Sequence, residues 1–134
     1  MATISITKEL NDEFLRDVGI TAVEGGIGYW SQIEGYGKFV NSLYVGDTFQ
    51  KSLNPSNYLG KLYVIDDWTQ EPDPNEPTHE LNTDLIAKGM QLVLDSGRWK
   101  HIAQAILAED AGDLDAGDAD VIVQLGCFGE VVYG

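Results

Sequence analysis

The chain has 134 residues, and its 22 acidic residues against 8 basic ones give a formal net charge of −14 at pH 7. This length is typical of one domain, and a hydrophobic content of 43% is too high for a disordered acidic tail. The charge excludes a general affinity for nucleic acid or anionic lipid, because proteins bind phosphate groups through Lys and Arg.

The N-terminal third predicts a strand, a helix and the start of a sheet. Small, polar and apolar residues alternate over 2–6 as in a short strand, and Thr7 is placed to cap a helix that runs through Val23. The glycine pair at 25–26 is expected to stop that helix. Aromatic and β-branched residues with interspersed glycines over 27–45 predict strands joined by tight turns.

The middle of the chain predicts a loop followed by a hairpin. Turn-forming residues over 46–60 predict an exposed loop, and the run 61–65 predicts a strand. The segment 71–77 carries three of the four prolines, so it is interpreted as a hairpin connection. Residues 78–81 are then expected to return antiparallel to 61–68.

Three helices are predicted after this hairpin. Asn82 or Thr83 is expected to cap the first, and the apolar spacing over 98–109 indicates an amphipathic second. Asp118 is expected to cap the third, over 119–128, which is apolar nearly all round and therefore buried. This order predicts one α+β domain over 1–134, a small antiparallel sheet of about three or four strands with about four helices, mainly on one face.

The acid-rich run from Asp110 to Asp120 invites comparison with a calcium loop. An EF-hand loop that starts at Asp113 would have Asp118 where glycine is needed and Gln124 where a bidentate Glu is needed. The alternative is that these acids form a turn and cap the helix that follows. We therefore expect no metal ion and no cofactor.

The acidic charge is unevenly distributed. Seven acids lie within 62–87 and seven more within 101–134, and neither stretch contains Lys or Arg. If the two stretches meet in space, they would form a negative surface able to attract a basic protein. The acidic residues expected to contact such a partner are Asp66, Asp67, Asp110, Asp113, Asp115, Asp118 and Asp120.

Aromatic side chains are the second set of candidate contact residues, and those singled out are Tyr29, Trp30, Tyr36 and Trp68. An alternative function follows from them, a non-catalytic small-ligand module in which Tyr29 and Trp30 line a pocket between sheet and helices. No nucleophile, base and orienting group occur at a recognised spacing, so catalysis is the less favoured hypothesis. The single cysteine, Cys127, is expected to be a core thiol in a protein of the reducing cytoplasm.

Three segments carry a resemblance to known proteins: Thr21-Ala22-Val23-Glu24-Gly25-Gly26-Ile27-Gly28-Tyr29-Trp30, then Ile86-Ala87-Lys88-Gly89, and the closing residues 118–134. In these segments the chain resembles a family of small acidic proteins of unassigned function encoded by bacteriophages and prophages. The resemblance implies an accessory protein in the host cytoplasm that blocks a basic, nucleic-acid-binding host protein, as DNA mimics and anti-defence proteins do. It supplies no catalytic residues.

Overall fold

The structure is a computed structural model that describes residues 9–46 and 50–134. The expected strand at 2–6 and the expected cap at Thr7 lie outside these residues. The helices are α1 (Asp12–Thr21), α2 (Tyr36–Ser42), α3 (Thr83–Ser96), α4 (Lys100–Leu107) and α5 (Ala116–Phe128), with a π-helical turn η1 (Ala22–Gly26) and a 3-10 turn η2 (Ala111–Asp113). The strands are β1 (Ser31–Glu34), β2 (Tyr58–Val64) and β3 (His79–Asn82).

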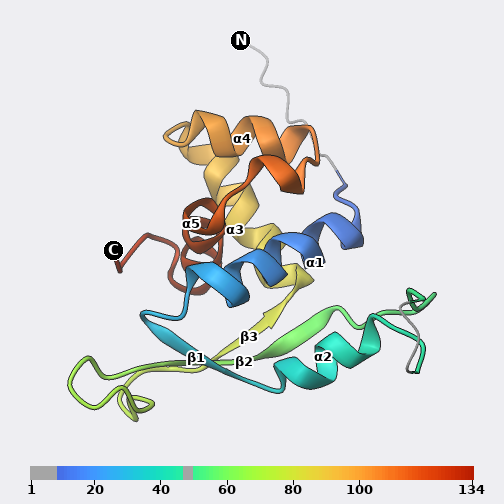
Figure 1. Ribbon diagram of the computed structural model, residues 1–134. Coiled ribbons are helices and arrows are strands. Elements are labelled where there is room, and N and C mark those ends of the chain that lie inside the picture. Colours follow the sequence, from blue (N-terminus) through green and yellow to red (C-terminus); the bar gives the residue numbers. More distant parts are fainter. Residues whose placement is uncertain (1–8, 47–49) are drawn as a thin grey trace.

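The three strands form an antiparallel sheet in the order β1-β2-β3. Ile33 pairs with Leu62, and Leu62 pairs with His79, so β3 returns along β2 as predicted. Helices α1, α3 and α5 cover one face of the sheet, and the opposite face is open to solvent (Figure 1). The predicted α+β class, with helices mainly on one side of a small sheet, is confirmed.

Residues 36–42 are the largest error of the sequence prediction, because they form helix α2 and not a strand. Gly35, with a left-handed φ of 91°, ends β1 and starts the helix. Tyr36, Phe39 and Val40 are spaced by three and four residues and turn toward the core on one side of this helix. The aromatic content of the segment concealed that helical period.

Helix starts are set by side chains that accept hydrogen bonds from backbone amides. Asn82, one of the two residues expected to cap α3, is the cap, with its Oδ1 atom 2.9 Å from the Leu85 nitrogen. Helix α1 begins later than predicted, at Asp12, and its cap is Asn11. Helix α5 begins earlier than predicted, at Ala116, because Asp115 is its cap in place of Asp118.

Helix α5 is buried between the other elements, as its apolar composition predicted. It crosses α3 with almost no side chain between the two backbones. A Cβ atom on Gly126 would lie 2.5 Å from the carbonyl oxygen of Leu85, and one on Gly89 would collide with the carbonyl oxygen of Ile122. The helices and the sheet share one hydrophobic core. Within the described residues, no helix has the length and apolar character needed to cross a membrane.

Candidate functional site

Asp120 and Trp30, both expected at a binding surface, lie instead in a buried polar network. The Asp120 side chain is only 8% exposed and Trp30 only 1%. Trp30 donates its Nε1 hydrogen to Asp120 over 2.8 Å, and the Tyr29 hydroxyl donates to the other carboxylate oxygen over 2.6 Å. Burial, and then this hydrogen bond to Asp120, raises the pKa of Tyr29 to about 12. Asp120 and Trp30 therefore stabilise the interior of the fold. The prediction that they contact a partner is wrong, because neither side chain reaches the surface.

Gln124 extends this network to the last residues of the chain. Its Nε2 atom donates to Asp120 over 2.9 Å, and its Oε1 atom accepts from the backbone nitrogens of Val132 and Tyr133, each over 2.8 Å. The Tyr133 ring then stacks on Trp30, with centroids 5.4 Å apart and planes 7° from parallel. Sequence reasoning missed Gln124, although a lone polar residue within an apolar helix signals a buried hydrogen bond.

The aromatic pocket suggested for a small ligand is not supported at Trp30. Phe128 packs against the Trp30 ring with a centroid distance of 5.4 Å, and Tyr133 covers it from another side. Tyr36 is also engaged, because its ring stacks on Phe39 and its hydroxyl donates to Glu24 over 3.2 Å. Trp30 and Tyr36 thus pack within the protein, whereas the Tyr29 ring keeps part of its surface exposed.

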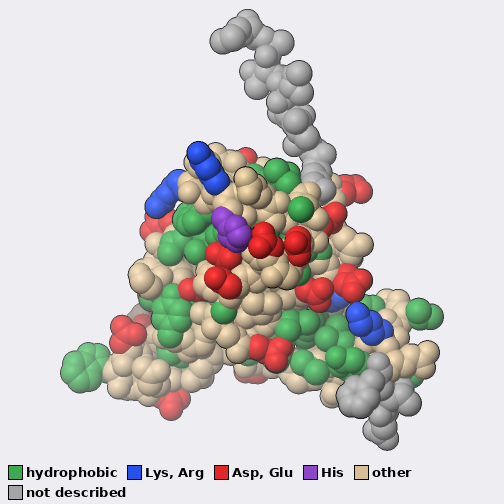
Figure 2. Space-filling view, turned by 45° about the horizontal axis from the view of Figure 1, so that its top comes forward, with side chains coloured by type: hydrophobic (Ala, Val, Ile, Leu, Met, Phe, Trp, Pro, Cys, Tyr) green, Lys and Arg blue, Asp and Glu red, His purple; other side chains and the backbone are tan. Residues whose placement is uncertain are grey.

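The acidic segment between α4 and α5 serves chiefly as a helix start. The Asp118 nitrogen donates to Asp115 over 2.8 Å, and the Asp115 nitrogen donates to Asp118 over 3.1 Å. These reciprocal bonds form a capping box, which agrees with the helix-cap interpretation of the run. The His101 ring contacts the Asp113 carbonyl oxygen, 3.0 Å from Nε2, and the Asp118 Oδ2 atom lies 3.9 Å from the same nitrogen. Figure 2 shows acidic side chains grouped beside a histidine on the surface. Asp110, Asp113 and Asp115 remain exposed on this surface.

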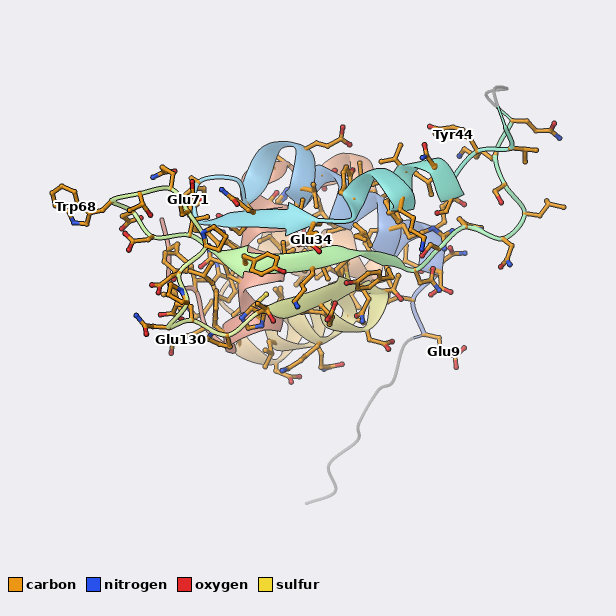
Figure 3. The ribbon with its side chains drawn as sticks, turned by 90° about the horizontal axis from the view of Figure 1, so that it is seen from below. Glu9, Glu34, Tyr44, Trp68, Glu71 and Glu130 are labelled. Carbon is orange, nitrogen blue, oxygen red and sulfur yellow. The ribbon has the colours of Figure 1, made fainter. Side chains whose placement is uncertain are left out.

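The loop that joins β2 to β3, residues 65–78, brings together three of the predicted contact residues. Trp68 lies at its tip with 95% of its side chain exposed, and Asp66 and Asp67 directly precede it (Figure 3). Glu71 and Asp73 follow, so within residues 66–73 four carboxylates accompany one exposed indole. We call residues 66–73 the Trp68 loop.

Hydrogen bonds fix the shape of the Trp68 loop. The Asp66 carboxylate accepts from the Trp68 nitrogen over 2.8 Å, and the Asp66 backbone nitrogen donates to the Glu71 carbonyl over 2.8 Å. Gln32 of β1 donates its Nε2 hydrogen to the Gln70 carbonyl over 2.8 Å, which ties the loop to the sheet. The indole is therefore held out in solvent by an ordered turn.

The Trp68 loop and the acidic segment between α4 and α5 do not form one continuous patch. The Trp68 loop extends from one end of the sheet, whereas the segment after α4 lies near the start of α1 (Figure 1). A hydrogen bond of 2.7 Å from the Asn11 nitrogen to the Glu109 carboxylate confirms that second position. The two acidic stretches, 62–87 and 101–134, do touch elsewhere, because the His79 ring packs on Phe128 with centroids 5.2 Å apart, but these two groups of carboxylates lie on separate surfaces.

Comparison of the chain with protein-family models, with curated proteins and with solved structures found no match. The resemblance to small acidic phage proteins therefore stays a prediction.

Cys127 is expected to react slowly with thiol reagents. Burial raises the pKa of its thiol to about 12, so very little thiolate is present near neutral pH. At pH 8 we expect the folded chain to react at least about tenfold more slowly with an aromatic disulfide than the same chain in denaturant. Absorbance of the released thiolate measures both rates, and equal rates would contradict a core role for Cys127.

Proposed function

We propose that this chain is a non-catalytic acidic binding protein that occupies a basic, nucleic-acid-binding surface on a partner protein. This is the function expected of a phage-encoded accessory protein of the DNA-mimic or anti-defence type. The observation that carries the proposal is the Trp68 loop, an exposed indole flanked by carboxylates on an ordered turn.

An exposed tryptophan on an ordered turn is well suited to binding. Tryptophan contributes more binding free energy per residue than most side chains when it enters a pocket, because it buries a large apolar area. Trp68 loses little conformational entropy on binding, since the turn is already held by the bonds of Asp66 and Gln70. The loop therefore supports a role as an anchor in an interface.

The neighbouring charges specify the chemistry of the partner. Asp66, Asp67 and Glu71 surround the indole with negative charge, which repels phosphate groups and attracts Lys and Arg. Arg side chains also stack on indole rings. A surface that normally binds nucleic acid offers the matching basic residues.

Trp68→Ala is expected to abolish capture of the partner while leaving the fold intact. Full-length chain is immobilised and exposed to bacterial lysate at about 50 mM and about 500 mM salt, because a charge-driven complex weakens strongly over that range. We expect one basic nucleic-acid-binding protein to be captured at low salt and to be displaced by duplex DNA. Mass spectrometry identifies it, and calorimetry with the purified partner then measures at least about a tenfold loss of affinity for Trp68→Ala.

Two further variants control this experiment. Leu53→Ala removes another fully exposed apolar side chain far from the loop and is expected to bind like the wild type. The double variant Asp66→Asn and Asp67→Asn keeps the acceptor that holds the Trp68 nitrogen, and it is expected to weaken binding through charge alone. Capture of the same proteins by wild type and Trp68→Ala, with equal affinities, would refute the role of the loop.

A further inference from the structure

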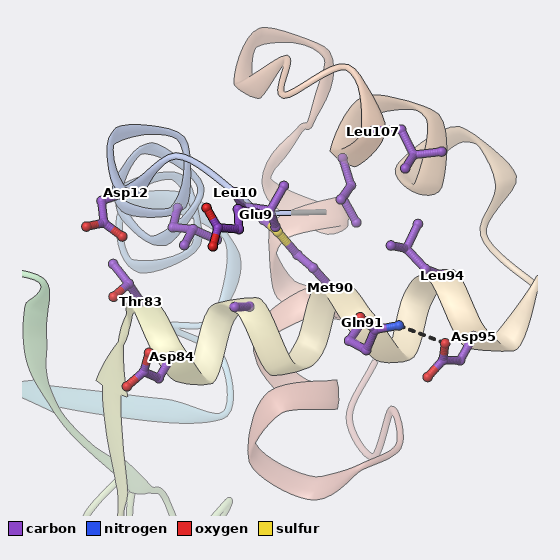
Figure 4. A pocket seen from close by; sticks show the side chains of 13 residues that line it. Glu9, Leu10, Asp12, Thr83, Asp84, Met90, Gln91, Leu94, Asp95 and Leu107 are labelled. Carbon is purple, nitrogen blue, oxygen red and sulfur yellow. Dashed lines mark hydrogen bonds between the residues drawn. The ribbon is translucent and has the colours of Figure 1, made fainter. Parts of the chain in front are cut away.

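A second surface lies on the helical side of the molecule, where α3 is left uncovered between the start of α1 and the end of α4. A groove of about 630 Å³ follows this side of α3 (Figure 4). It shares no residue with the Trp68 loop.

The floor of the groove is apolar and is long enough to hold a short helix. Ala87 and Leu94 lie on one side of α3 above Met90, which is fully buried beneath them, and Leu10 and Leu107 close the groove on either side. Leu107 is 54% exposed, which is high for a leucine at the end of an amphipathic helix. The lining runs from Thr83 to Asp95, or about 18 Å at 1.5 Å per residue, so about three turns of helix fit along it.

The rim of the groove is acidic. Glu9, Asp12, Asp84 and Asp95 line it, and none of the described lining residues is Lys or Arg. Asp95 accepts a hydrogen bond of 2.8 Å from Gln91, its neighbour on α3, and Asp12 accepts one of 3.2 Å from Asn57. An apolar floor between carboxylates matches a helix with an apolar face bordered by Lys or Arg.

Charge also favours a basic helix over a second copy of the chain or a lipid surface. A second copy of the chain would bring another net charge of −14 against four carboxylates, and anionic lipid headgroups would be repelled in the same way. A basic helix gains both the apolar contact and the attraction.

We propose that the groove between α1, α3 and α4 binds a basic amphipathic helix, about three turns long, of a partner protein. This goes beyond the proposed function, because it adds a second docking surface that operates without the Trp68 loop.

The test uses the full chain and a defined probe. The probe is a fluorescent, acetylated and amidated peptide of about 14 residues, with Leu at i, i+3, i+4, i+7 and i+11 and Lys or Gln elsewhere. Its comparison peptide has the same composition in scrambled order, so that it keeps the charge and loses the apolar face. Fluorescence anisotropy is expected to give at least about tenfold tighter binding of the amphipathic peptide. Equal binding of the two peptides would overturn the proposal.

Two charge-matched variants locate the binding. Leu107→Lys places a cation at the groove and is expected to lower the affinity for the amphipathic peptide at least about tenfold. Leu53→Lys makes the same change of charge at another exposed leucine and is expected to weaken it less than about twofold. Amide chemical shifts in α3 and α4 should move with the peptide, and loss of affinity equal in both variants would overturn the proposal.

Three further measurements exclude other occupants. Deleting residues 1–8 is expected to leave the peptide affinity unchanged, whereas a tenfold gain would show that the chain's own start fills the groove. Sedimentation is expected to show a monomer. A dimer of the wild type that Leu107→Lys dissociates would show instead that a second copy of the chain occupies the groove. Trp68→Ala is expected to bind the peptide normally, so failure of the groove and failure of the proposed function give different results.

Discussion

Gly89→Ala is expected to lower the free energy of unfolding by about 2–4 kcal/mol, a large fraction of the stability of a small domain. The added methyl group would collide with the carbonyl oxygen of Ile122, which belongs to the backbone of α5. Backbone cannot move aside as a flexible side chain can, so α3 and α5 must separate and lose packing along their crossing. Urea unfolding followed by circular dichroism measures the change.

Gly37→Ala is the matched control for this substitution. Gly37 also lies in a helix, α2, but a Cβ atom added there has no atom within 4 Å. Its replacement by alanine is expected to be neutral or to stabilise by up to about 1 kcal/mol, through helix propensity. Equal unfolding midpoints for Gly89→Ala and the wild type would contradict the close crossing of α3 and α5.

Asp120→Ala is expected to cost about 2–4 kcal/mol of stability, because three donors lose their acceptor at once. The Trp30 Nε1 and Gln124 Nε2 groups would be left without this acceptor in the interior, and the Tyr29 hydroxyl would lose its shortest partner. Gln124 also holds Val132 and Tyr133, so we expect the final residues to loosen as well. Urea unfolding gives the cost, and near-ultraviolet circular dichroism reports the Trp30 environment.

Two variants distinguish the network from a general effect of charge. Asp120→Asn keeps the oxygen that accepts from Trp30 and Gln124, and it is expected to lose less than half as much stability as Asp120→Ala. Asp113→Ala removes one negative charge from an exposed position and is expected to stay within about 0.5 kcal/mol of the wild type. A loss below about 1 kcal/mol for Asp120→Ala would show that the network is not structural.

Local signals in the sequence were sufficient where one interaction determines an element. Asn82 before an apolar stripe predicted the start of α3, and the unbroken spacing over 98–109 predicted α4. The proline-rich connection and the short strand after it predicted the pairing of β3 with β2. In each case the deciding contacts lie within one turn of helix or across one hairpin.

Predictions failed where the deciding contacts are distant in sequence. Asp120 lies within an acid-rich run that is typical of a surface, and its burial depends on Trp30, which is 90 residues away along the chain. Residues 36–42 were predicted as strand because aromatic residues favour strands. The helical spacing of Tyr36, Phe39 and Val40 was given less weight. The groove was not predicted either, because α1, α3 and α4 enclose it only once the chain has folded.

The π-helical turn η1 makes the length of the chain between α1 and β1 critical. Its closing bond, from the Ile27 nitrogen to the Ala22 oxygen over 2.9 Å, encloses one residue more than an α-helical turn does. Deleting a residue from Ala22–Gly26 would restore α-helical spacing and rotate everything after it by about 100° about the helix axis. Trp30 would then leave Asp120, although no residue of the network had been altered. In this segment, a change in the number of residues is therefore more damaging than most changes in their identity.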